Sequence, residues 1–337
     1  MRILYIGNKL ENSGDNPSGV ITLGLKLSEF NETILISNKR NQVLRLIDMV
    51  LTMLRRINDY DIILIDAFSG RAYYYLIICS LIAIIIHKPY IPILRGGDLP
   101  NTLKKFKYFS KIIFNYSLFN ITPSLFLKKH FNLHNISTKY IPNFIDLNNY
   151  PFKKRERCRP RLFWVRSFHK VYNPEFAVKV ISELVKKYPN AELCMVGPDK
   201  DGSLATCKVL IKKLNLTKNV KITGYLSKKD WINLSKNYDI FINTTNYDNQ
   251  PVSVLEAMSL GFPIVTTDAG GLKYLHTNGV DALIVKKNDV KGMINKIEVL
   301  INNAKQSKNL SINARLKSED FCWKKIKPIW EKVLISN

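Results

Sequence analysis

The chain alternates short, continuously apolar segments with longer segments of helical periodicity, and this alternation occurs twice. The apolar segments of the first half read "RILYIG", "ETILIS", "DIILID" and "YIPIL", and those of the second half read "RLFWV", "AELCMVG", "VKITG", "DIFINT", "PIVTT" and "DALIV". Short apolar strands separated by helices are typical of parallel sheets that helices cover on both faces. The pattern predicts an α/β chain of two doubly wound, Rossmann-like domains that face each other across an interdomain cleft.

The alternation breaks near "NNYPFKKRERCRPRLFW", where proline and clustered charge interrupt the periodicity. A chain of 337 residues is also long for a single core. We therefore expect an N-terminal domain over residues 1–152 and a C-terminal domain over residues 153–319. Apolar residues recur near helical spacing in residues 320–337, which predicts a final helix that docks on the N-terminal domain.

The composition is strongly basic, with 51 Lys and Arg against 27 Asp and Glu and a net charge of +24. Such an excess favours polyanionic partners, namely nucleic acid, anionic lipid or phosphate-bearing substrates. The five cysteines are dispersed and form no C-x-x-C pair, which favours reduced thiols and argues against a structural zinc site. Because "MRILYIGN" lacks the features of a signal peptide, we expect a cytoplasmic protein.

The longest apolar run covers the fifteen residues 72–86. A bilayer-spanning helix needs about 20 residues, and this run lies between two strand-like segments. It predicts a buried crossover helix, with a helix at the membrane interface as the alternative.

The stretch "YDNQPVSVLEAMSLGFPIVTTDAGG", residues 247–271, combines two carboxylates with signs of a helix start. Asp248 and Glu256 lie eight residues apart, and Pro251 stands between them. Proline suits the first turn of a helix, which predicts a helix that starts at residues 250–251. The amides of Val252 and Ser253 would then point out of a positive helix end and could bind phosphate.

Two interpretations of this helix remain open from spacing alone. Glu256 lies about 7.5 Å along the helix axis from Pro251, at 1.5 Å per residue, so it could reach the ribose of a nucleoside diphosphate held at the helix end. Asp248 would lie beside the group attached to the distal phosphate. Alternatively, Ser253 and Glu256 form a capping box, which needs no ligand.

The same stretch resembles the E-x7-E region of the family 4 retaining glycosyltransferases of GT-B fold, with aspartate at the first position. The resemblance extends, in the family's order, to "IPNFID" at residues 141–146, "MVGPDKDGSL" at residues 195–204 and "NVKITGYLSKKDW". The glycine fingerprint G-x-G-x-x-G is absent after "RILYIG", which argues against an NAD enzyme.

This resemblance implies an enzyme that moves a hexosyl unit, with retained anomeric configuration, from a nucleotide-sugar to a saccharide or lipid-linked glycan acceptor in cell-surface polysaccharide synthesis. It implies a UDP-sugar as the donor, bound by the C-terminal domain, an acceptor bound by the N-terminal domain, and no metal or other cofactor. The alternatives are a GT-B-fold nucleotide-sugar epimerase and a basic membrane or nucleic-acid binding protein with a degenerate site.

The resemblance also assigns roles to residues. Glu256 would hold the ribose, Asp248 would contact the donor sugar, and Arg166 in "VRSFHKVYNPE" would stabilise the departing diphosphate; these three are the candidate catalytic residues. The family's lysine position falls near Tyr172, so its charge would come from Lys170. The full donor-binding set consists of Gly19, Arg166, Lys170, Gly197, Pro251, Val252, Ser253 and Glu256. A surface role for Arg166 and a plain turn at Gly19 are the alternatives.

The candidate acceptor-side residues are Arg95, Asp98 and Asn143. Arg95 stands in "LRGGDLP", where many relatives carry a histidine near the reacting sugar. Since a guanidinium cannot act as a base, the identity of any catalytic base stays open. Gly19 would belong to a glycine-containing loop, "ENSGDNPSGV", that approaches the donor phosphates.

Residues 101–139 contain no Asp or Glu but several lysines. A helix over residues 103–119 would place Lys104, Lys107 and Lys111 on one face. The opposite face would hold Phe106, Phe109, Ile113 and Tyr116. The basic face predicts contact with an anionic membrane at the inner face of the cell membrane; the alternative is that the aromatic face packs in the core and the lysines are only solvated. No nucleic-acid motif is evident, so no nucleic-acid partner is expected.

Overall fold

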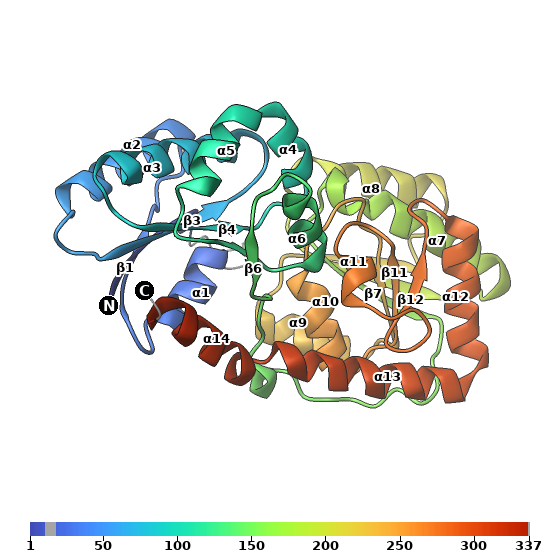
Figure 1. Ribbon diagram of the computed structural model, residues 1–337. Helices are drawn as coiled ribbons and strands as arrows, with labels where there is room; N and C mark the ends of the chain where they lie inside the picture. Colours follow the sequence, from blue (N-terminus) through green and yellow to red (C-terminus); the bar gives the residue numbers. More distant parts are fainter. Residues whose placement is uncertain (11–17, 336–337) are drawn as a thin grey trace. The chain divides into compact units, whose positions relative to one another are not determined.

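The protein is described here by a computed structural model that covers residues 1–10 and 18–335 (Figure 1). It divides into two compact units, Met1–Ile141 and Pro142–Asn337. Each unit contains one six-stranded sheet in which every paired strand is parallel to its neighbour. The prediction of two doubly wound α/β domains is confirmed.

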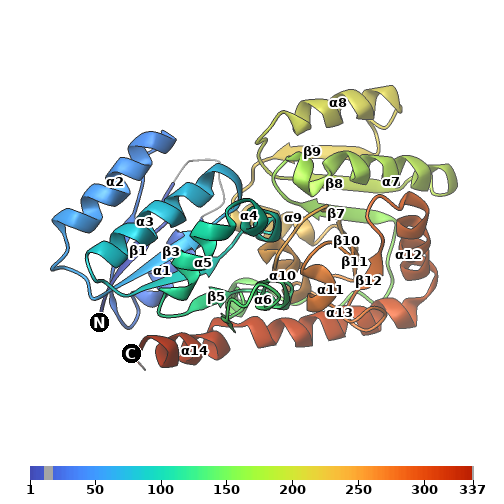
Figure 2. The same cartoon turned by 45° about the horizontal axis from the view of Figure 1, so that its top comes forward.

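The first unit has the strand order β2-β1-β3-β4-β5-β6. The bounds of these strands in chain order are β1 (Arg2–Ile6), β2 (Glu32–Ile36), β3 (Ile62–Ala67), β4 (Tyr90–Leu94), β5 (Asn120–Thr122) and β6 (Thr138–Tyr140). Its helices are α1 (Gly19–Leu27), α2 (Gln42–Arg55), the 3-10 turn η1 (Gly70–Ala72), α3 (Tyr73–Ile85), α4 (Leu99–Lys105), α5 (Lys107–Asn115) and α6 (Leu125–Asn132). Helices α2, α3 and α5 cover one face of this sheet, and α1 lies on the other (Figures 1 and 2).

The second unit has the strand order β12-β11-β10-β7-β8-β9. The bounds of its strands are β7 (Arg161–Val165), β8 (Glu192–Val196), β9 (Val220–Gly224), β10 (Ile240–Asn243), β11 (Ile264–Thr267) and β12 (Leu283–Val285). Its helices are η2 (Leu147–Asn149), η3 (Lys170–Tyr172), α7 (Pro174–Lys187), α8 (Ser203–Lys213), α9 (Lys228–Ser235), α10 (Val252–Ser259), α11 (Leu272–Leu275), α12 (Val290–Asn302), α13 (Ala304–Ser318), η4 (Glu319–Phe321) and α14 (Trp323–Ile335).

Strand β7 shows why most strand positions of this unit are apolar. Successive side chains of a strand point to opposite faces. Leu162 and Trp164 pack in the core beneath α7, whereas Phe163 and Val165 pack in the core beneath α10. Because helices cover both faces, the positions after Arg161 are all buried in apolar surroundings.

The boundary between the units lies earlier in the chain than residue 152, after Ile141. The reason is that the intervening segment bonds to the second unit. The amide of Asn143 donates to Gln250 Oε1 at 2.6 Å, and the Tyr150 hydroxyl donates to Glu256 Oε1 at 2.8 Å. The return of the final helix to the N-terminal domain stays a prediction.

The helix expected over residues 103–119 is wrong as a single element. The structure has two helices, α4 and α5, which meet at Phe106 with backbone angles of φ −112° and ψ 36°. On α5, Ile113 is buried, whereas Phe109 is 43% exposed and Tyr116, the C-cap of the helix, is 70% exposed. The proposed aromatic face is therefore only partly in the core.

The apolar run at residues 72–86 forms α3 between β3 and β4, as expected for a crossover helix. In the part of the chain that the structure describes, none of the helices has both the length and the apolar character required to cross a bilayer. The five cysteines are free thiols. Strands β5 and β6 were not predicted, because three residues are too few to show a period.

Candidate functional site

The candidate donor residues of the second unit lie at the carboxyl edge of its sheet, where the strand order reverses. The connection after β7 leads to β8 on one side, and that after β10 leads to β11 on the other. Ligands of open α/β sheets bind outside the carboxyl ends of the strands at such a point. Arg166 directly follows β7, and Asp248 lies in the loop between β10 and α10.

Arg166 and Asp248 form an ion pair across this point, in which Nη2 of the arginine donates to Oδ2 of the aspartate. Their side chains are only 14% and 12% exposed. Water therefore screens the pair weakly. The fold thus brings together two of the three candidate catalytic residues.

The loop after β7 holds Arg166 from two sides. The guanidinium carbon lies 4.0 Å from the centre of the Tyr172 ring. A Cβ atom on Gly197 would lie 1.8 Å from the carbonyl oxygen of Arg166, so only glycine allows this approach. The Nε of Arg166 is buried and has no hydrogen-bond partner among the residues that the structure describes, which leaves it available to a ligand.

Lys170 lies on the same loop, in η3, and is exposed. Its amide donates to Asp201 Oδ2 at 2.9 Å, and its carbonyl accepts from Asn246 Nδ2 at 3.4 Å. The backbone of this loop is therefore tied to the loops after β8 and β10. Tyr172, at the family's lysine position, packs on Arg166 instead of adding a charge.

Helix α10 begins one residue later than expected, at Val252, with Pro251 as its N-cap. The amides of Val254 and Leu255 donate to the Pro251 carbonyl. Those of Val252 and Ser253 belong to the first turn, which offers them no intrahelical acceptor. No side-chain bond caps this helix, and the buried Ser253 Oγ has no partner within the described residues. The capping box is therefore not formed.

Glu256 is 4% exposed and lies within a polar network. Its Oε1 accepts from the Tyr150 hydroxyl at 2.8 Å and forms an ion pair with Lys228 Nζ. Burial, reinforced by the charge of Glu256, raises the pKa of Tyr150, so this hydroxyl stays protonated and donates. These two bonds fix the orientation of the carboxylate inside the unit.

Two glycines support the loop that carries Asp248. The amide of Gly271 donates to the Asp248 carbonyl at 3.0 Å. A Cβ atom on Gly270 would lie 2.1 Å from that carbonyl oxygen, and one on Gly271 would lie 1.6 Å from the Asn249 oxygen. The double glycine of the motif is therefore required for the backbone of the acidic loop to pack closely.

Asn143, a candidate acceptor-side residue, braces the same loop. Its Nδ2 donates to the Gln250 carbonyl at 2.9 Å, and its amide donates to Gln250 Oε1 at 2.6 Å. The residue therefore holds the chain just before α10. The structure places it with the candidate donor residues of the second unit.

Arg95, the second acceptor-side candidate, belongs to a buried network at the switch point of the first sheet. Its Nε donates to Asp66 Oδ1 at 3.0 Å and its Nη2 to the Tyr5 hydroxyl at 2.9 Å, while Tyr5 donates to the same aspartate oxygen at 2.9 Å. A Cβ on Gly19 would lie 3.0 Å from Arg95 Nε and Cζ. Gly19, the first residue of α1, thus lets the chain pass over the guanidinium.

The remaining candidates of the first unit lie at its surface. Asp98 is the N-cap of α4 and accepts from Asn101 Nδ2 at 2.6 Å. Lys104, Lys107 and Lys111 are exposed. Most of the glycine-containing loop, residues 11–17, lies outside the described residues.

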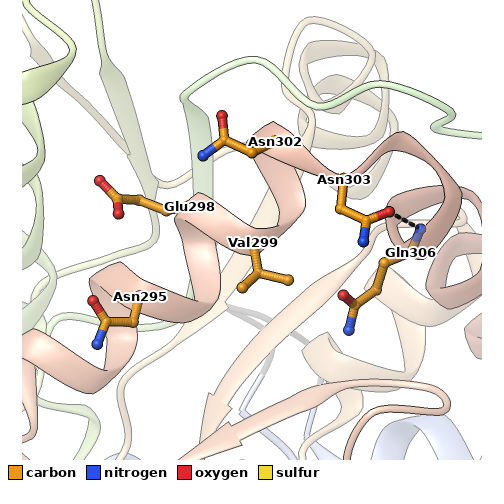
Figure 3. Close-up of a pocket in the computed structure, with 6 residues that line it drawn as sticks. All are labelled: Asn295, Glu298, Val299, Asn302, Asn303 and Gln306. Carbon is orange, nitrogen blue, oxygen red and sulfur yellow. Dashed lines mark hydrogen bonds between the residues drawn. The ribbon is translucent and has the colours of Figure 1, made fainter.

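A separate surface pocket of about 440 Å³ lies between α12 and α13 (Figure 3). It is lined by Asn295, Glu298, Val299, Asn302, Asn303 and Gln306. Asn303 Oδ1 accepts from the Gln306 amide at 3.0 Å, and Glu298 is paired with Lys187. None of these residues is a candidate site residue. Within residues 1–10 and 18–335, no cluster of three or more His, Cys, Asp or Glu side chains is arranged to hold a metal ion.

Three residues of the second-unit site were missed in the sequence, namely Tyr150, Lys228 and Gln250. Only Gln250 lies inside the recognised motif. Lys228 and Tyr150 are 28 and 106 residues from Glu256 and carry no spacing signal. The nearest clue was their position in "NNYPF" and "YLSKKDW", which the resemblance covers only in part.

Chemically, this edge of the second sheet offers a guanidinium, two helix-start amides and a hydroxyl that have no acceptor or partner in the described part of the chain. Such donors bind a phosphate-like anion. Glu256, further along α10, is an acceptor for hydroxyl groups. The arrangement suits a nucleoside diphosphate.

Solved structures share this architecture over the whole chain. The crystal structure of Alr3699/HepE of Anabaena in complex with UDP and glucose matches with a TM-score of 0.79 and 17% identity, and the match covers 100% of both chains. Sucrose-phosphate synthase of Thermosynechococcus elongatus matches with a TM-score of 0.81 and 14% identity, also over 100% of both chains. The fold is GT-B, as predicted.

Residues 149–317 match the family described as "Glycosyl transferases group 1". This segment is half of the chain and contains Arg166, Asp248 and Glu256. The chain belongs to this family.

Relatives with similar sequences are also named as glycosyltransferases. An uncharacterized glycosyltransferase of Haemophilus influenzae is 28% identical over 161 residues, which are 48% of this chain and 44% of that protein. The capsular polysaccharide biosynthesis glycosyltransferase CapM of Staphylococcus aureus is 25% identical over 284 residues, or 76% of this chain and 72% of CapM. The N,N'-diacetylbacillosaminyl-diphospho-undecaprenol alpha-1,3-N-acetylgalactosaminyltransferase of Campylobacter jejuni is 35% identical over 119 residues, or 35% of this chain and 30% of that enzyme. The chain aligns with less than half the length of the first and third of these relatives.

Proposed function

We propose that this protein is a retaining glycosyltransferase that moves a hexosyl unit from a UDP-sugar to a saccharide or lipid-linked glycan acceptor in cell-surface polysaccharide synthesis. The observation that carries the proposal is the cluster formed by Arg166, Asp248 and the free first turn of α10 at the switch point of the second sheet. Membership of the group 1 family supports the reaction class.

The donor diphosphate binds between Arg166 and the start of α10. The amides of Val252 and Ser253 and the Ser253 hydroxyl donate to phosphate oxygens. Arg166 Nε supplies a further donor, and its guanidinium exchanges its contact with Asp248 for one with the diphosphate. UDP in the crystal structure of HepE supports uridine as the base.

Catalysis is electrostatic in this proposal. As the sugar–phosphate bond breaks, negative charge grows on the departing diphosphate. Fixed cationic and amide donors in a partly buried site stabilise that charge more than they stabilise the bound donor. Asp248, released from Arg166, contacts the donor sugar, while Glu256 accepts from the ribose hydroxyls. The reaction needs no metal because Arg166 and the helix end supply the positive charge.

The acceptor is a glycan, either free or linked to a lipid. The names of two relatives support this class, since CapM acts in capsular polysaccharide biosynthesis and the Campylobacter jejuni enzyme is named for a diphospho-undecaprenol substrate. A lipid-linked acceptor lies at a membrane, and the exposed Lys104, Lys107 and Lys111 would attract the chain to anionic lipid at the inner face of the cell membrane.

A panel of nucleotide-sugars in a thermal-shift assay tests donor binding. A donor at 100 times its Kd raises the free energy of unfolding by about 2.7 kcal/mol. We expect UDP-sugars to raise the Tm and Arg166→Ala to reduce the shift. If no UDP-, GDP-, ADP- or CMP-sugar changes the Tm, donor binding is contradicted.

Product analysis then tests the reaction. Nuclear magnetic resonance of the product formed in the presence of a chelator reports both the anomeric configuration and the metal requirement. We expect an axial donor linkage to give an axial product at an unchanged rate. An inverted product, or a rate that falls in the chelator and returns with added metal, contradicts the corresponding part of the proposal.

A further inference from the structure

Helix α2 of the first unit is apolar on the face that it turns to solvent. Its exposed apolar side chains are Val43, Leu44, Ile47, Leu51 and Leu54, with exposures of 66%, 56%, 47%, 39% and 47%. At 100° per residue, these five positions fall within an arc of about 100°. A surface helix normally turns polar side chains to water, whereas none of residues 1–10 and 18–335 covers this apolar face.

The opposite face of α2 is already used by the core of the unit. Met49 and Met53 are fully buried there. Arg45 is also buried, and its guanidinium donates to Asn8 Oδ1 and to the carbonyls of Lys39 and Arg40. The helix cannot turn its exposed apolar face inward by rotation, because that would unpack the methionines and expose the bonded arginine.

Cationic side chains lie at both ends of the apolar face. Lys39 and Arg40 precede the helix, and Arg55 and Arg56 end it. Apart from the buried Arg45, residues 39–56 contain four basic residues, of which Arg56 is paired with Asp59, and one acidic residue, Asp48, which accepts from the Ser37 hydroxyl. An apolar stripe with cationic ends fits an anionic interface, where the stripe enters the lipid and the cations meet the headgroups.

Neighbouring helices on the same side of the first sheet also carry exposed aromatic rings. Helix α3 packs between α2 and α5, and all three lie on the same side of the first sheet in both views (Figures 1 and 2). Tyr74 on α3, Tyr108 on α5 and Tyr116 at the C-cap of α5 have exposures of 49%, 75% and 70%. Tyrosine rings with apolar bodies and polar tips are suited to the headgroup layer.

We propose that the exposed face of α2 is a membrane-insertion surface that docks the first unit on an anionic bilayer. The helix lies in the plane of the interface with its apolar arc among the acyl chains. The charge distribution favours lipid over a second copy of this chain. An antiparallel α2–α2 contact would place Lys39 and Arg40 of one copy against Arg55 and Arg56 of the other, and like charges repel.

Vesicle flotation with the full chain tests the proposal. Vesicles of phosphatidylcholine with phosphatidylglycerol serve as the probe, and pure phosphatidylcholine is the uncharged reference. The triple variant L44Q/I47Q/L54Q keeps helix propensity, because glutamine is a good helix former. We expect it to lower the partition coefficient on anionic vesicles by about 100-fold, roughly fivefold for each half-exposed apolar side chain.

The matched control is V209Q/L316Q, which changes two exposed apolar residues on α8 and α13 of the second unit, with exposures of 67% and 56%. We expect it to bind vesicles like the unaltered chain. Far-UV circular dichroism and the Tm establish that each variant is folded. The assay contains no sugar donor, so its result does not depend on whether the chain transfers sugar.

Three results would overturn the proposal. The unaltered chain could fail to float with anionic vesicles, or the folded triple variant could float as well as the control. The third is that analytical ultracentrifugation shows a concentration-dependent dimer of the unaltered chain but a monomer of the triple variant, and that the unaltered chain does not bind vesicles. That result would assign the apolar face to a second copy.

Discussion

The two units share one architecture but use their charges differently. In the second unit, Arg166–Asp248 and Lys228–Glu256 pair at the loops and helices that follow the carboxyl ends of the strands, next to unpartnered donors. In the first unit, Arg95, Asp66 and Tyr5 bond to one another inside the fold, while most other cations lie at the surface. The same doubly wound sheet therefore supports a candidate ligand site in one unit and an internal charge network in the other.

This difference shows that the role of a cationic residue depends on which groups accept its hydrogen bonds. A cation whose donors are all used within the protein stabilises the fold. A cation that keeps a buried donor unpaired can bind a ligand at little reorganisation cost. Arg166 belongs to the second class because its Nε has no partner among the described residues.

The largest expected effect concerns Arg95 in the first unit. Arg95→Met leaves the buried Asp66 without its counter-charge, which should lower the free energy of unfolding by about 3–5 kcal/mol. Urea unfolding measures the change. Adding Asp66→Asn to the same chain should restore a large part of the loss. Unchanged stability with a raised KM for the acceptor would instead support a direct acceptor-side role.

In the second unit, the expected effect of replacing Arg166 is on activity, whereas that of replacing Arg95 is on stability. Arg166→Ala should lower kcat about 10²- to 10³-fold, the usual effect of removing one donor to a developing anion. Steady-state transfer assays measure this. The matched control is Arg161→Ala, at the amino end of the same strand, where the arginine pairs with the exposed Glu192. Equal effects at both positions would contradict the assignment.

Glu256 tests whether the second unit binds the nucleoside. Glu256→Gln removes the charged acceptor for the ribose hydroxyls and should weaken UDP binding about 10- to 100-fold, since a hydrogen bond to a charged group is worth about 1.5–3 kcal/mol. Isothermal titration calorimetry measures the Kd. Glu298→Gln, in the pocket between α12 and α13, is the control and should leave the Kd unchanged.

The smallest expected effect is a pH dependence that belongs to the second unit. Burial lowers the pKa of His276, although its bond to Asp281 opposes the shift. Below the unfolded pKa of about 6.5, the unfolded chain takes up a proton that the folded chain resists. Stability should therefore fall as the pH drops below that value, by at most about 1.4 kcal/mol per pH unit.

Hydrogen exchange at pH 7.5, 6.5 and 5.5 would locate this loss. We expect amides around residues 276–285 of the second unit to lose protection, and His276→Gln to flatten the dependence. The internal network of the first unit contains no histidine, so Tyr5, Asp66 and Arg95 should not contribute. If protection in His276→Gln depends on pH as steeply as in the unaltered chain, His276 is not the cause of the pH dependence.

Much of the fold could be predicted from the sequence because local patterns encode it. Apolar runs such as "DIFINT" are strands wherever helices cover both faces, and Pro251 marks the start of a helix to within one residue. The prediction of one helix over residues 103–119 failed because its periodicity continues through Phe106 although its backbone does not. The exposed arc of α2 was overlooked, since a pattern of apolar residues does not reveal which of two apolar faces meets the core.

The candidate site also contains residues that local sequence patterns reveal and residues that they do not. The chain order of the motifs was enough to select Arg166, Asp248 and Glu256, because the family signature is written in consecutive residues. It could not select Tyr150 and Lys228, which approach Glu256 from 106 and 28 residues away. Nor could it show that Arg95 donates hydrogen bonds to Tyr5 and Asp66. Sequence fixes the order and period of groups along the chain, whereas the partner of each charge depends on long-range packing, which only the folded chain establishes.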